Sequence, residues 1–220
     1  MRARILALIC ASMFALSPLR AQDALSDVFR ESISHVAAVA GWSDLRDDRQ
    51  VVREIRVYQG FGIGIPNWFA RVWQDEGGQS HVHLGHFWTP LTSGLPRDGR
   101  DYEREFRTHM DTAFACTQFR RSADMHVCTP RRRLGRNEVA RLSTALWALE
   151  LDSLRKPINE PLGLDGWTVV VEYRSASGYR SASAWGPGTE SPDAGVRLIA
   201  QIAALVSEAA ERVRGRAVRR

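Results

Sequence analysis

Hydrophobic and polar residues alternate in three successive segments of the chain, the pattern that predicts β-strands with one buried face. We expect strands over residues 54–65, 68–74 and 80–88. Pro66-Asn67 separates the first two, and Gly77-Gly78 is a hairpin signal between the second and the third. Together these segments predict a three-stranded antiparallel meander.

The first strand shows the alternation most clearly. Ile55 and Val57 point to one face, whereas Glu54, Arg56 and Tyr58 point to the other. The apolar set predicts the face that packs on the core.

A second hairpin is predicted in the C-terminal third. Asp165-Gly166 precedes an alternating segment over 167–173, and residues 179–185 form the return strand. Glu172 belongs to the polar set of this hairpin, which predicts a position on the outer face of its strand.

Apolar residues at helical spacing predict four helices, over residues 25–39, 102–114, 139–149 and 196–213. Gly41 stands where the first of them should end, and Asp193 is placed to cap the last. Because the strands come in antiparallel groups, the fold class is α+β. We expect an antiparallel sheet built from the meander and the later hairpin, packed against amphipathic helices.

The N-terminus has the features of a secretory signal. Arg2 and Arg4 precede an uncharged apolar stretch over 5–16, and Ala21 is a small residue at the expected cleavage site. We therefore predict a signal peptide over residues 1–21, with an uncleaved anchor as the alternative. No later apolar run approaches the length of about 18–20 residues that crosses a bilayer, which excludes a multi-span membrane protein.

These segments divide the 220-residue chain into a signal peptide, a single α+β domain over residues 22–212 and a basic tail over 213–220. The formal charge is +5, and three arginines belong to residues 1–21. The small remaining charge and the predicted periplasmic or secreted location argue against nucleic acid as a partner. The arginines of the tail could instead contact an anionic membrane surface, although a solvated basic end is the simpler interpretation.

Two cysteines remain after the signal, Cys116 and Cys128. In an oxidising compartment an even pair predicts a disulfide. A hairpin centred on Ser122 would set the two cysteines opposite each other.

Three histidines form the one cluster with metal-ligand chemistry, His81, His83 and His86. Imidazole is a common zinc ligand, and this spacing resembles, over six residues, the first histidine motif of metallo-β-lactamase-fold hydrolases. A metal-binding protein or metal-dependent hydrolase is thus an alternative function, with His109 or His126 as further ligands. In a regular strand, however, His86 faces away from the other two, and the simpler interpretation puts His81 and His83 on the solvent side.

Other short motifs carry no function. The glycines over residues 60–64 alternate within a strand instead of opening a helix, so close approach by another element explains them better than phosphate binding. Ser153-Leu154-Arg155-Lys156 matches the Ser-x-x-Lys of penicillin-interacting enzymes, but Lys156 is the sole lysine and the second motif of those enzymes needs another.

The C-terminal third combines short motifs in a fixed order: Trp147, Leu164-Asp165-Gly166-Trp167, Glu172-Tyr173-Arg174, Tyr179-Arg180 and Trp185-Gly186-Pro187. In this it loosely resembles a group of exported bacterial proteins of unknown function, which implies an exported α+β domain and no activity.

With no complete catalytic set and no cofactor motif, we expect a non-catalytic binding or interaction module. Its partner would be an envelope protein or a small ligand. Aromatic and arginine side chains are typical of recognition surfaces, and four are candidates here: Tyr58, Trp73, Tyr179 and Arg180.

Overall fold

The computed structural model describes residues 27–47, 52–60, 67–88, 116–122, 125–130, 133–155 and 167–215. Its helices are α2 (Asp27–Ala40), α5 (Arg136–Trp147), the short 3-10 helix η2 (Leu151–Ser153) and α6 (Ala194–Gly215). Its strands are β1 (Arg53–Gly60), β2 (Asn67–Gln74), β3 (Ser80–Trp88), β4 (Cys116–Ser122), β5 (Met125–Pro130), β6 (Thr168–Ser175) and β7 (Gly178–Trp185).

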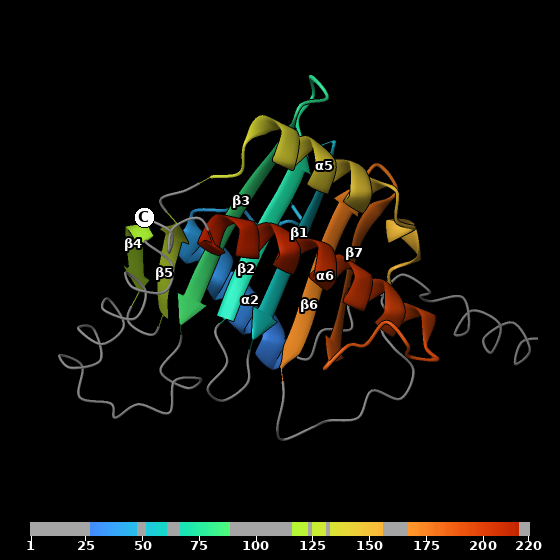
Figure 1. Ribbon diagram of the computed structural model, residues 1–220. Coiled ribbons are helices and arrows are strands. Elements are labelled where there is room, and N and C mark those ends of the chain that lie inside the picture. The colour runs from blue at the N-terminus through green and yellow to red at the C-terminus, as the bar shows by residue number, and fades with distance from the viewer. Residues whose placement is uncertain are drawn as a thin grey trace, which may run out of the picture.

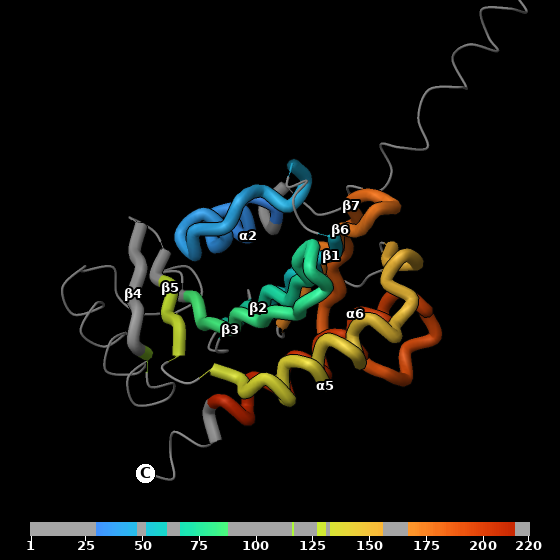
Figure 2. Tube along the Cα trace, turned by 90° about the horizontal axis from the view of Figure 1, so that it is seen from above, coloured from blue at the N-terminus to red at the C-terminus, as the bar shows by residue number. Residues whose placement is uncertain are grey.

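The strands form one seven-stranded sheet in the order β4-β5-β3-β2-β1-β6-β7, and every neighbouring pair is antiparallel. Figure 1 shows this sheet crossed by α5 and α6 in front and α2 behind. Seen from above, the sheet is the middle of three layers, with α2 on one side and α5 and α6 on the other (Figure 2). The predicted α+β class, the meander β1-β2-β3 and the hairpin β6-β7 are confirmed.

The face of the sheet toward α5 and α6 carries the larger apolar core. Strand residues of one alternating set, such as Ile55, Val57 and Val171, pack against Leu146 of α5 and Ile199 of α6. All five are fully buried. This face is the one that the alternation predicted.

The opposite face is also buried, because α2 covers it. Ile33, Val36 and Ala40 of the helix pack against Tyr58 and Phe69 of the sheet. Tyr58 is fully buried, so its predicted place on an exposed recognition surface is wrong. The sheet is covered on both faces, whereas an alternating pattern is typical of a sheet with one solvated face.

Helix ends follow the predicted signals. Gly41 adopts a φ of 79°, and the amide of Trp42 donates to the carbonyl of Ala37, a Schellman-type end to α2. At α6, the carboxylate of Asp193 accepts hydrogen bonds from the amides of Gly195 and Val196.

Helix α6 continues to Gly215, and Val213 belongs to the larger core. The packed domain therefore extends past the predicted boundary at residue 212.

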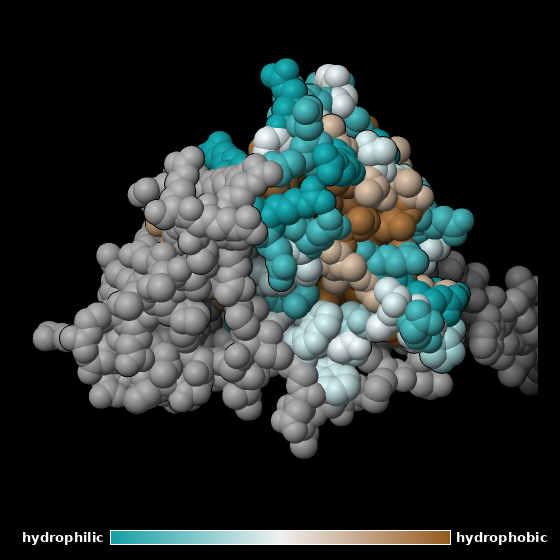
Figure 3. Space-filling view, in the orientation of Figure 1, coloured by the Kyte–Doolittle hydropathy of each residue, from teal (hydrophilic) through white to brown (hydrophobic). Residues whose placement is uncertain are grey.

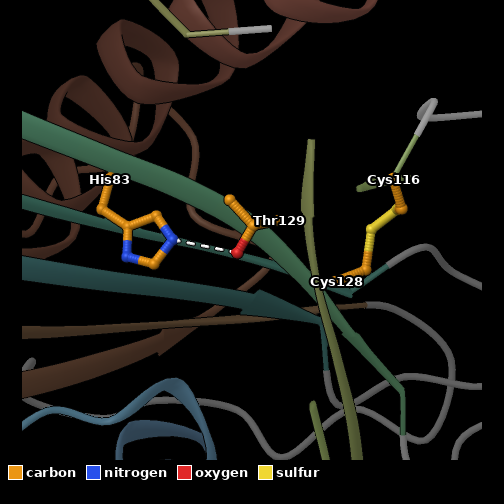
Figure 4. Close-up of a disulfide and its surroundings, with 4 residues drawn as sticks. All are labelled: His83, Cys116, Cys128 and Thr129. Carbon is orange, nitrogen blue, oxygen red and sulfur yellow. Dashed lines mark hydrogen bonds between the residues drawn. A yellow bond between two sulfur atoms is a disulfide. The ribbon is translucent and has the colours of Figure 1, made fainter. Parts of the chain in front are cut away.

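The β4-β5 hairpin carries a disulfide between Cys116 and Cys128, whose Cα atoms lie 5.7 Å apart (Figure 4). Its register differs from the prediction. Ser122 pairs with Met125, and a shift between Cys116 and Gln118 places Cys116 opposite Pro130 instead of Cys128. The irregularity brings the cysteines together diagonally.

Several predictions lie outside the described residues: the signal peptide over 1–21, the helix over 102–114, the glycine run over 61–64 and the last arginines over 216–220. In the part of the chain that the structure describes, no helix has the length and apolar character needed to cross a membrane.

Candidate ligand pocket

A pocket of about 280 Å³ opens among residues of β2, β3 and the end of β5. It is lined by Trp42, Arg71, Trp73, Val82, His83, Leu84, Thr129, Pro130, Arg133, Leu134 and Val213. The lining divides into a cationic and aromatic part from the α2 face of the sheet and an aliphatic part that contacts α6.

The pocket exists because β5 leaves β3 early. The two strands pair only where His86–Trp88 of β3 lie opposite residues 126–128 of β5. Beyond Cys128 the chain reaches Pro130, which has no amide N–H to extend the ladder. The strands separate there, and Arg133 and Leu134 pass the gap on the way to α5.

Arg71 is one of two arginines in the described lining, with Arg133. Its guanidinium lies 4.5 Å from the ring centre of Trp73 and 5.8 Å from that of Trp42, within range of cation–π attraction. Nη2 donates to Oε2 of Glu54 at 2.8 Å. The side chain of Arg71 is 17% exposed, so the pocket is where this charge meets solvent.

Trp42 reaches the pocket because of the turn that ends α2. The Schellman geometry at Gly41 carries the chain back over the sheet, where the indole meets the edges of Phe69 and His83 at 5.1 and 5.4 Å between ring centres. His83 in turn shares a hydrogen bond of 3.1 Å between Nε2 and Oγ1 of Thr129 (Figure 4). Trp42, His83 and Thr129 thus form one side of the pocket from three separate elements.

A buried ion cluster lies beneath Arg71. Glu54 is 0% exposed and Arg56 is 1% exposed, and Oε1 of Glu54 accepts from Nε of Arg56 at 2.5 Å. Arg56 also donates to the carbonyl of Ser43, in the loop that follows α2. The Glu54 carboxylate therefore binds two guanidinium groups and fixes the position of Arg71. Glu54, Arg56 and Arg71 together carry an excess positive charge.

The cluster continues along the sheet to a second buried carboxylate. Cross-strand pairing puts Arg56 opposite both Arg71 and Glu172. Glu172 is 7% exposed, and its oxygens accept hydrogen bonds from the hydroxyls of Tyr58 at 3.2 Å and Tyr179 at 2.8 Å. The prediction that Glu172 lies on an outer face is wrong, since the second helical layer covers that face.

Burial shifts two pKa values in this cluster. Burial raises the pKa of Glu172, whereas the Arg56 charge and the tyrosine hydrogen bonds lower it, and burial prevails. Burial and the neighbouring Glu172 charge raise the pKa of Tyr58 well above its usual value. Tyr58 is therefore a neutral donor at physiological pH.

The predicted histidine cluster does not converge. Nε2 of His81 lies 2.8 Å from Oδ2 of Asp75, whereas His83 contacts Thr129. His86 is 9% exposed and lies beside Ala210 and Val213, on the α6 face. Among the described residues, no group of three His, Cys, Asp or Glu side chains could hold a metal ion. The side chains of His109 and His126 lie outside the described part.

Of the predicted recognition residues, Trp73 lines the pocket, whereas Tyr58 and Tyr179 hold Glu172. Arg180 lies 3.6 Å from Asp152, away from the pocket lining. Sequence reasoning missed Trp42 and Arg71. The available signal was Arg71 itself, an arginine between aromatic and aliphatic residues in a strand that reads as mostly buried.

A second hollow of about 240 Å³ lies between α5 and α6, with Leu142 and Leu205 in its wall. Figure 3 shows apolar side chains gathered over these helices. Nothing in the structure indicates what would cover it.

Comparison of the chain with known protein families, with curated proteins and with solved structures finds no match.

Proposed function

We propose that the protein is an exported bacterial binding module that acts without catalysis, in the periplasm or outside the cell. Residues 1–21 have the composition of a signal peptide, and the C-terminal third resembles exported proteins. The disulfide between Cys116 and Cys128 is compatible with an oxidising compartment.

The observation that carries the binding function is the placement of Arg71. Its charge lies in the pocket lining, between two indoles and above a fully buried carboxylate. A charged side chain held rigidly at a concave surface is costly unless it is paired. A guanidinium that pairs through one nitrogen can offer another nitrogen to a ligand. The pocket is therefore the proposed binding site.

Export is tested on protein recovered from its native cells. Amino-terminal sequencing should show a chain that begins at Gln22, with Cys116 and Cys128 oxidised. An intact Met1 together with free thiols would contradict the proposed location.

Binding is tested with the chain over residues 22–220, incubated with the small-molecule fraction of an envelope extract and analysed by native mass spectrometry. We expect a retained compound that is lost in Arg71→Gln and kept in Arg155→Gln. Arg155 is a matched control because it is exposed and lies outside the pocket lining. Retention that does not depend on Arg71 would contradict the proposed site.

A further inference from the structure

We propose that the ligand of this pocket is a small amphipathic carboxylate, a molecule with one carboxylate and a compact apolar body. This inference rests on the proposed binding function and names its ligand class. The chemistry is common to short fatty acids and to aryl-substituted acids.

The first support is the donor that Arg71 presents. Its hydrogen bond to Glu54 uses Nη2, while Nη1 has no acceptor among the described residues and Nε is buried without one. The side chain is 17% exposed at the pocket. A carboxylate oxygen of a ligand would supply the acceptor that Nη1 lacks, in a charge-assisted hydrogen bond.

The second support is the charge around the site. Arg133 is exposed at the rim, and no Asp or Glu belongs to the pocket lining in the part of the chain that is described. Beneath the lining, Glu54 already serves both Arg56 and Arg71. The potential at the pocket therefore favours an anion over a neutral or cationic ligand.

The third support is the opposite wall, which is aliphatic. Val82, Leu84, Leu134 and Val213 line it. A fully hydrated anion such as inorganic phosphate would leave this wall in contact with water, whereas an apolar body attached to the carboxylate would cover it.

Size limits the body of the ligand. The volume of about 280 Å³ lies just below the range of about 300–1,000 Å³ for small-molecule sites. A chain of about eight carbons or a single aromatic ring is on this scale.

Isothermal titration calorimetry of the chain over residues 22–220 tests the inference. The probes are octanoate and phenylacetate, each paired with its uncharged amide, and inorganic phosphate. We expect saturable binding of at least one acid, at least tenfold tighter than its amide, and no saturable binding of phosphate. Tighter binding of octanoate would indicate a lipid-derived ligand, and tighter binding of phenylacetate an aryl-substituted ligand.

Variants separate the two walls. Arg71→Gln should weaken the acid at least tenfold and remove its preference over the amide, whereas Arg71→Lys should retain part of that preference. Leu134→Asn should weaken acid and amide by the same factor. Arg155→Gln should leave both unchanged. If Arg71→Gln does not fold, the ratio of acid to amide in the unaltered protein and in Leu134→Asn still decides.

Three outcomes overturn the inference. They are equal binding of acid and amide, tighter binding of phosphate than of either acid, and no binding of either acid. If neither acid binds but the extract still yields a compound that depends on Arg71, only the ligand class fails. If the extract yields none, the proposed function fails as well.

Discussion

The two faces of the sheet are both buried, yet they are held by different interactions. Toward α5 and α6 the strands present Ile55, Val57 and Val171, which pack on apolar helix residues. Toward α2, the next residues along the same strands include Glu54 and Glu172, each bonded to specific partners.

The difference separates stability from specificity. Apolar burial is non-directional and tolerates exchange of similar side chains. A buried carboxylate is stable only while its partners stay in place, so Glu54 fixes the positions of Arg56 and Arg71. The pocket lies where this second kind of packing reaches the surface, at Arg71.

The largest effect is expected at Glu54. Glu54→Gln should lower the free energy of unfolding by about 3–5 kcal/mol, because it leaves two guanidinium groups without a charged partner. The control is the neighbouring residue on the other face, where Ile55→Val should cost about 0.5–1.5 kcal/mol. Urea denaturation measures both, and equal costs for the two variants would remove the distinction between the faces.

Next is the disulfide. Replacing Cys116 and Cys128 together by serine should cost about 3 kcal/mol, as expected for a closed loop of this size. Because β4 and β5 contact α2, we expect amide exchange to accelerate in α2 more than in α6. Hydrogen exchange followed by mass spectrometry measures this, and uniform acceleration would show that the two faces respond as one.

A pH effect should distinguish Glu172. Its pKa is raised in the folded protein above the usual value of 4.5, so the folded state holds the proton more tightly than the unfolded state. Its contribution is then fully present below about pH 4.5 and is lost as pH rises through the folded pKa.

The glutamine side chain in Glu172→Gln cannot titrate, so this variant should not lose stability in the way that Glu172 causes as pH rises. Its stability relative to the unaltered protein should rise from pH 4.5 toward neutral pH, as measured by thermal unfolding. Asp44 and Asp75 have lowered pKa values and are common to both proteins, so Asp75 cancels in the difference, whereas the Asp44 charge also contributes to the raised pKa of Glu172. Parallel pH profiles would indicate that Glu172 is not strained by burial.

The smallest effect is expected from zinc. His81 and His83 lie on the α2 face with other partners, and His86 lies on the α6 face, so we expect zinc to leave the melting temperature unchanged. His83→Ala is the control. A saturable rise in melting temperature that this variant abolishes would support the metal hypothesis.

The strands and helices could be predicted because their signals are local. Alternation at residues 54–58, the turn at Gly77-Gly78 and the cap at Asp193 each depend on a few neighbouring side chains. The order of the central strands follows from short antiparallel connections.

The site could not be predicted, because it depends on which residues meet across strands. Glu172 faces Tyr58 instead of water because α2 covers this face of the sheet. This helix precedes Glu172 by more than a hundred residues in the sequence. Polar residues in alternation have the same pattern in both cases. The pocket also requires that β5 stop pairing with β3 after Cys128. Pro130 explains this separation, but only when the register of the two strands is known.

Gly85 faces Phe69 across β2 and β3, and a β-carbon at this glycine would lie 2.2 Å from the phenyl ring. The two positions therefore form one steric unit beneath Trp42. Among relatives of this chain, a larger residue at 85 should be found only together with a smaller one at 69. Paired substitution at 69 and 85 would show that the packing beneath the Trp42 indole is maintained as a unit.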